Sequence, residues 1–139
     1  SLDSVLENAR NPLIRFDFAN NIDVLMAAAD VIITKAGGLT VSEALTKHLP
    51  MIIFKPIPGQ EKNNACYVEA IGAGKIAYTQ QELKIIIEEL IKNQQTIEQM
   101  RSSSVHAFPG HSAERAVTAI LNLIYELPLT LSAGATTAV

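Results

Sequence analysis

A pair of adjacent glycines, between an apolar run and an amphipathic stretch, most limits what this chain can fold into. The run at 31–33 is apolar and β-branched, which is typical of a parallel strand covered on both faces. Gly37 and Gly38 lack a Cβ, so the backbone can turn sharply there and approach a ligand closely. Thr40 and Glu43 then have the spacing of a capping box, which predicts a helix start. The sequence therefore predicts a strand, a glycine turn and a helix.

Strand-like and helix-like stretches alternate along the rest of the chain. Short β-branched or alternating runs predict strands at 14–18, 31–34, 51–54 and 75–78. Apolar residues at helical spacing predict helices at 22–29, 41–48, 62–71, 80–92, 97–104 and 112–126, and the tail of another at 1–12. This alternation favours an α/β fold, in which a mostly parallel, Rossmann-like sheet has helices on both faces. We expect one domain over residues 1–126 and a disordered tail over 127–139.

The composition excludes several classes of protein. Of the 139 residues, 48% are hydrophobic, which is enough for a packed core. No apolar run nears the roughly 20 residues of a membrane-spanning helix. A net charge of −3 with scattered basic residues gives no electrostatic footprint for nucleic acid. The lone Cys66 excludes a disulfide framework and a multi-cysteine metal site, which fits a reducing cytoplasm, and no histidine pair has metal-ligand spacing.

The loops at 18–21, 35–43 and 55–64 are expected at the carboxyl ends of the strands. Ligands of open α/β sheets bind at this edge. The amides of Gly38 to Thr40 and the positive end of the helix can hold a diphosphate, although a plain connecting turn also explains the two glycines.

Acidic and amide side chains of the same loops have two readings each. Glu43 is either the partner in the capping box or a ligand for a ribose diol. Gln60 and Glu61 offer the donors and acceptors that sugar hydroxyls need, or they are solvated loop residues. The spacing alone leaves both alternatives open.

These segments together resemble one family of enzymes. The resemblance is carried by the helix at 21–29, by the stretch DVIITKAGGLTVSEAL at 30–45, by LPMII at 49–53 and by PGQEKNN at 58–64. The combination resembles the carboxyl-terminal domain of GT-B glycosyltransferases. It is most similar to monogalactosyldiacylglycerol synthases and processive diacylglycerol glucosyltransferases, and more distantly to the N-acetylglucosaminyltransferase that forms lipid II. The match covers about residues 16–77.

The resemblance implies a UDP-sugar as donor substrate, with no metal and no other cofactor. The residues that it implies as substrate-binding are Gly37, Gly38, Leu39 and Thr40 for the diphosphate, Glu43 for the ribose, Gln60 and Glu61 for the sugar with Asn64 behind them, and Phe18 and Ala19 for the uracil. It implies no catalytic residue in this chain, because the general base of GT-B enzymes lies in their acceptor domain.

The function that the resemblance implies is the donor domain of an inverting hexosyltransferase, which acts on a membrane lipid and lies peripherally at the membrane surface in the full-length protein. The acceptor domain and the first two donor-domain strands are not found in this sequence, so we expect the chain alone to be inactive. In a 3-2-1-4-5-6 sheet those strands separate 14–18 from 31–34.

We expect either that the chain is a fragment of a longer polypeptide or that an oligomer or a partner chain covers the exposed sheet edge. Three alternatives stay open. The first is a non-catalytic nucleotide-sugar-binding subunit that a partner completes, the second is a UDP-sugar epimerase-like domain, and the third is an α/β domain that binds no phosphate.

Overall fold

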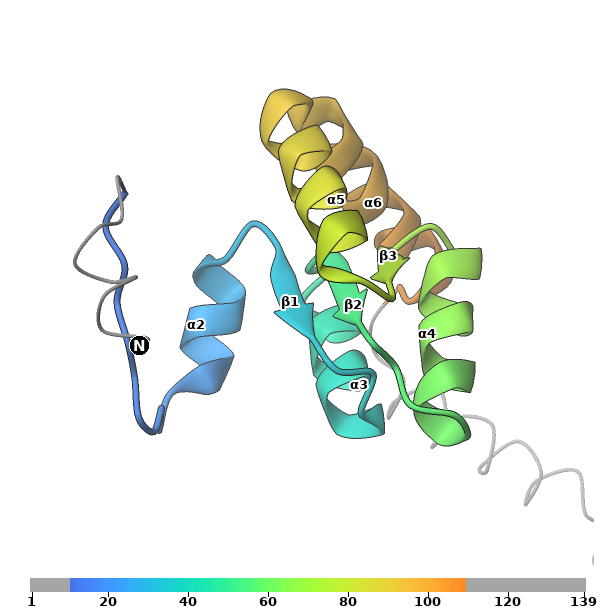
Figure 1. The fold of residues 1–139 in the computed structure, drawn as a ribbon. Helices are drawn as coiled ribbons and strands as arrows, with labels where there is room; N and C mark the ends of the chain where they lie inside the picture. Colours follow the sequence, from blue (N-terminus) through green and yellow to red (C-terminus); the bar gives the residue numbers. More distant parts are fainter. Residues whose placement is uncertain (1–10, 110–139) are drawn as a thin grey trace, which may run out of the picture.

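The computed structural model describes residues 11–109 (Figure 1). Its elements are α2 (Ile22–Ala28), β1 (Ile32–Thr34), α3 (Gly38–Thr46), β2 (Met51–Phe54), α4 (Gln60–Ala70), β3 (Gly74–Ala77), α5 (Gln80–Lys92) and α6 (Gln94–Ala107). The strands form one parallel sheet in the order β1-β2-β3, in which Ile33 pairs with Ile52 and Ile52 with Lys75. Each strand therefore lies beside its successor, and all three end at the same edge.

Helices pack on both faces of this sheet, because successive side chains of a strand point to opposite faces. Met51 and Ile53 point into a core that α2, α3 and α4 complete, whereas Ile52 points into a second core with α5 and α6. All three of these β2 residues are at most 1% exposed. The predicted Rossmann-like α/β architecture is confirmed for the described residues.

The predicted strand at 14–18 is wrong. This segment runs apart from the sheet, on the far side of α2 from β1 (Figure 1). Ile14, Phe16 and Phe18 are 78%, 55% and 82% exposed. The alternating pattern supplies an apolar face, but a strand also needs a neighbour that pairs with its amides and carbonyls. No strand of the described residues pairs with it, so β1 is left as an edge strand.

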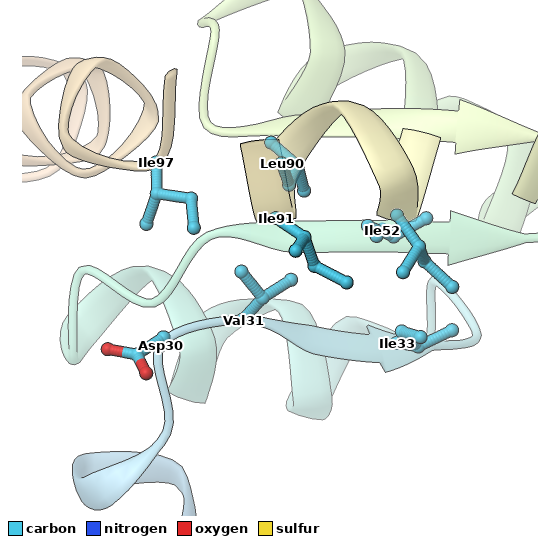
Figure 2. A pocket seen from close by; sticks show the side chains of 8 residues that line it. Asp30, Val31, Ile33, Ile52, Leu90, Ile91 and Ile97 are labelled. Carbon is cyan, nitrogen blue, oxygen red and sulfur yellow. The ribbon is translucent and has the colours of Figure 1, made fainter. Parts of the chain in front are cut away.

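The sheet face beside β1 is hollowed by an apolar cavity of about 280 Å³. In Figure 2, Val31 and Ile91 point toward one another across this cavity, whereas the carboxylate of Asp30 points away. Because α5 contacts β2 and β3 more than β1, Ile33 and Ile91 remain 50% and 77% exposed. The cavity contains almost no polar group, so it lacks the convergent donors and acceptors of a binding site for a polar ligand.

Most predicted boundaries are close to the observed ones. The strand at 51–54 and the helix at 80–92 are confirmed without change, while α3 and α4 begin earlier than predicted and α6 is longer at both ends. Residues 1–10 of the predicted first helix, the predicted helix at 112–126 and the tail at 127–139 lie outside the described residues. Among residues 11–109, the structure contains no helix that is both long and apolar enough to cross a membrane.

Candidate functional site

The amino ends of α3 and α4 lie together at the carboxyl edge of the sheet. Both helices begin at the lower edge in Figure 1, after the loops that leave β1 and β2. A Cβ built on Gly38, the first residue of α3, would lie 3.8 Å from Gln60 Nε2 and 3.9 Å from Asn64 Nδ2 of α4. The parallel register of β1 and β2 produces this proximity, because both strands end at the same level.

The glycine turn leaves open space in front of the backbone. Gly37 has φ −63° and ψ 138°, and Gly38 also avoids positive φ, so both have conformations that other residues adopt. Neither glycine therefore uses the extra conformational freedom that the sequence offered for a sharp turn. A Cβ on Gly37 would meet no atom within 4 Å. What the glycines provide is room for another molecule to approach the main chain.

The first turn of α3 presents free backbone donors. The first helical hydrogen bond is donated by Val41 N–H to Gly37 O over 2.9 Å. The amides of Gly38, Leu39 and Thr40 therefore have no acceptor within the helix. Such amides, with the positive end of the helix dipole, form a binding site for anions.

The capping box predicted from Thr40 and Glu43 is wrong. Gly37 occupies the N-cap position of α3, and no side chain caps the helix. Thr40 is already the third helical residue, so its hydroxyl cannot cap the start of the helix. Glu43 lies on the exposed surface one turn further on. Its carboxylate is thus not used as a cap.

Two side chains of α4 hold the neighbouring loops, Glu61 the loop before α4 and Asn64 the loop before α3. Gly59, its N-cap, has φ +102°, a conformation that favours glycine. The Glu61 carboxylate accepts a hydrogen bond from Ile57 N–H at 3.2 Å. Asn64 Nδ2 donates to Ala36 O at 2.9 Å, which joins α4 to the loop before α3.

Two lysines at the same edge were missed by the sequence analysis, which treated the basic residues as scattered. Lys35 Nζ donates to Lys55 O over 2.8 Å, and Lys55 Nζ lies 5.3 Å from the centre of the Phe54 ring. Both lysines are exposed. Each directly follows a strand, and this position was the signal that could have predicted them at the site.

Of the predicted site residues, the structure brings together those of the glycine turn and those of α4. The residues that meet are Gly37, Gly38, Leu39, Thr40, Gln60 and Asn64, with Glu61 in the adjoining loop. Phe18 and Ala19 lie in the segment that precedes α2, which runs on the far side of that helix from the sheet (Figure 1). The structure therefore does not bring them to this group.

The sequence profile of the glycosyltransferase family 28 C-terminal domain matches residues 2–120. The chain belongs to this family. The resemblance found in the sequence is therefore confirmed, and the described residues have the Rossmann-like fold of a GT-B carboxyl-terminal domain.

Relatives of this glycosyltransferase domain include two processive diacylglycerol β-glucosyltransferases. The Staphylococcus epidermidis protein is 38% identical over 115 residues, which cover 82% of this chain and 29% of the relative. The Bacillus cereus protein is 35% identical over 120 residues, 86% of this chain and 31% of the relative. The chain thus spans less than a third of these relatives.

A solved structure has a similar fold. The glycotransferase of kitacinnamycin matches with a TM-score of 0.56 and 22% identity, over 73% of this chain and 27% of that one. At this identity the likeness is one of fold alone.

Proposed function

We propose that this glycosyltransferase domain binds the UDP-sugar donor of an inverting hexosyltransferase with a membrane lipid as acceptor. The observation that supports this most directly is the meeting of two helix amino ends around the unobstructed backbone of Gly37. A pyrophosphate needs several donors from one side and close access to them. The glycine turn offers both.

The diphosphate would contact the free amides of Gly38, Leu39 and Thr40. Backbone amides and a helix dipole are fixed before the ligand arrives, so they stabilise its negative charge without reorganisation. The same groups would stabilise the charge that develops on UDP as it leaves. The ammonium groups of Lys35 and Lys55 at this edge add positive potential.

The ribose would be bound by Glu43, which is exposed and free of a capping role. The donor sugar would lie against Gln60 and Glu61, with Asn64 behind them. The Glu61 carboxylate keeps acceptor capacity, because its bond from Ile57 N–H uses one lone pair of one oxygen. The uracil would lie toward Phe18 and Ala19, which requires the segment before α2 to approach the turn.

We propose glucose as the sugar and diacylglycerol as the lipid, because the two bacterial relatives are named processive diacylglycerol β-glucosyltransferases. UDP-glucose carries an α-anomeric bond, so a β-product requires inversion at the anomeric carbon. An acceptor hydroxyl would attack that carbon, the bond to the UDP oxygen would break, and the hydroxyl proton would pass to a general base. We expect this base in the part of the full-length enzymes that the present chain does not span.

Calorimetric titration of UDP, UDP-glucose, UDP-galactose and UDP-N-acetylglucosamine into the chain tests this proposal. We expect UDP and at least one UDP-sugar to bind. Glu43→Ala should lower the affinity for UDP by roughly tenfold to a hundredfold, since a hydrogen bond to a charged group contributes about 1.5–3 kcal/mol. Glu98→Ala, which removes an exposed carboxylate on α6, is the matched control and should leave affinity unchanged.

Two results would contradict the proposal. A folded chain that binds no UDP would exclude a donor site in this domain. Equal affinity for ADP would leave a diphosphate site but contradict recognition of uridine.

A further inference from the structure

We infer that Asn64 is a positioning residue, which holds the glycine turn against α4 rather than contacting the donor sugar. This inference rests on the proposed function, because it concerns how the same site is assembled. Its basis is the hydrogen bond from Asn64 Nδ2 to Ala36 O, which joins residues 28 positions apart in the chain.

The carbonyl of Ala36 needs this partner. Ala36 is fully buried, and it lies beyond the end of β1, so no strand ladder reaches its carbonyl. The first helical bond of α3 uses the carbonyl of Gly37 instead. Among the described residues, the side chain of Asn64 is the group that satisfies Ala36 O. A buried carbonyl left without a donor is costly, so the turn is stable in this position when Asn64 is present.

The geometry also limits what else the Asn64 carboxamide can do. Its nitrogen points at the turn, 3.9 Å from where a Gly38 Cβ would lie. Gln60, one helical turn earlier, occupies the same side of α4 and has no corresponding bond to the main chain of the turn. Gln60 is therefore the amide that stays available to a sugar, and Asn64 is the one that fixes the turn.

A second bond joins the loop before α3 to the loop before α4, with its donor on the α3 side. Lys35, which precedes Ala36, donates to the carbonyl of Lys55 at the end of β2 over 2.8 Å. The loop before α3 thus receives a bond from α4 and gives one to the loop that leads to α4. Both helix amino ends are held at a fixed separation by these two bonds. Losing Asn64 should therefore move the amides that would bind the diphosphate, and this effect should not depend on which sugar UDP carries.

Calorimetry with UDP and with UDP-glucose on Asn64→Ala distinguishes the two roles. If Asn64 is a positioning residue, the affinities for UDP and for UDP-glucose should fall by the same factor, about threefold to tenfold. This is the effect of losing one net hydrogen bond. If Asn64 contacts the sugar directly, the affinity for UDP-glucose should fall while the affinity for UDP stays the same. That result would overturn the inference. Asn63→Ala is the matched control, because Asn63 is the adjacent exposed asparagine of α4. This variant should bind both ligands with the affinity of the unchanged chain.

Amide hydrogen exchange gives a readout that needs no ligand. In Asn64→Ala, the Val41 amide at the first turn of α3 should exchange several-fold faster, while the Ile53 amide in the central strand keeps its protection. Unchanged exchange at Val41 would overturn the positioning role even if the variant bound UDP poorly. If the unchanged chain binds no UDP but Val41 exchanges faster in the variant, the proposed function fails and the structural tie stands.

Discussion

At the scale of single residues, two glycines that look alike in the sequence have different reasons to be glycine. Gly38 has an ordinary helical backbone, and a Cβ there would make normal contacts of 3.8 Å and 3.9 Å with two α4 side chains. A Cβ on Gly74 would lie 2.6 Å from Val68 Cγ1 and 2.8 Å from Met51 O. The fold therefore requires glycine at 74 but not at 38, where the proposed approach of a diphosphate supplies a reason.

Alanine at each position should separate stability from binding. Gly38→Ala should raise the free energy of unfolding by about 0.4–1 kcal/mol, because alanine has less backbone entropy to lose, and it should weaken UDP binding by crowding the turn. Gly74→Ala should lower that free energy by about 1–3 kcal/mol through overpacking. Urea denaturation and calorimetry measure the two effects. If Gly38→Ala bound UDP normally, close approach of phosphate at Gly38 would be contradicted.

At the scale of elements, two capping-box patterns of the described residues, Thr40 with Glu43 and Thr79 with Glu82, differ in whether the structure uses them as a cap. Thr79 Oγ1 accepts from Glu82 N–H at 3.1 Å, and the Glu82 carboxylate accepts from Tyr78 N–H at 2.8 Å, so α5 begins with a closed cap. Thr40 and Glu43 have the same spacing, but α3 has already begun at Gly38. A three-residue spacing cannot show which residue is the first in the helix.

Removing each threonine tests this difference. Thr79→Ala should destabilise the chain by about 1 kcal/mol, the usual cost of losing an N-cap side chain. Thr40→Ala should change stability by less than about 0.5 kcal/mol, as expected of a helical residue that caps nothing. Urea denaturation of both variants is sufficient. An equal loss for Thr40→Ala would mean that its hydroxyl does bond to the start of α3 in solution.

The elements that the sequence predicted well are those whose own residues determine them. The apolar run at 51–54 is buried on both sides, and the broad apolar stripe at 80–92 faces the second core, so each was found with its observed limits. The segment at 14–18 has a good strand pattern, yet its state depends on a neighbour elsewhere in the chain.

The features of the candidate site likewise differ in how far the local sequence determines them. The loops at 35–43 and 55–64 were expected at one edge of the sheet because each follows a predicted strand, whereas the bonds of Asn64 and Lys35 depend on the register of two strands.

At the scale of the whole molecule, one face of the sheet is covered more fully at β2 than at β1. Ile33 and Ile52 pair in register and so point to the same face, but Ile52 is 1% exposed and Ile33 is 50% exposed. The reason is that α5 packs on β2 and β3 with α6 beside it, while β1 is an edge strand of the described residues and has the cavity of Figure 2 beside it. The side chains of this face therefore change from buried to half-exposed between β2 and its neighbour β1.

Truncating the two isoleucines should reveal this gradient in solution. Ile52→Ala should lower the free energy of unfolding by about 2–5 kcal/mol, since it removes buried methylenes and leaves a cavity. Ile33→Ala should cost about 1 kcal/mol, because half of its side chain already contacts water. Urea denaturation at several protein concentrations measures both. If Ile33→Ala cost as much as Ile52→Ala, the face of β1 would be covered in solution. A concentration-dependent cost would then identify a second copy as the cover, and a concentration-independent cost would identify residues outside 11–109.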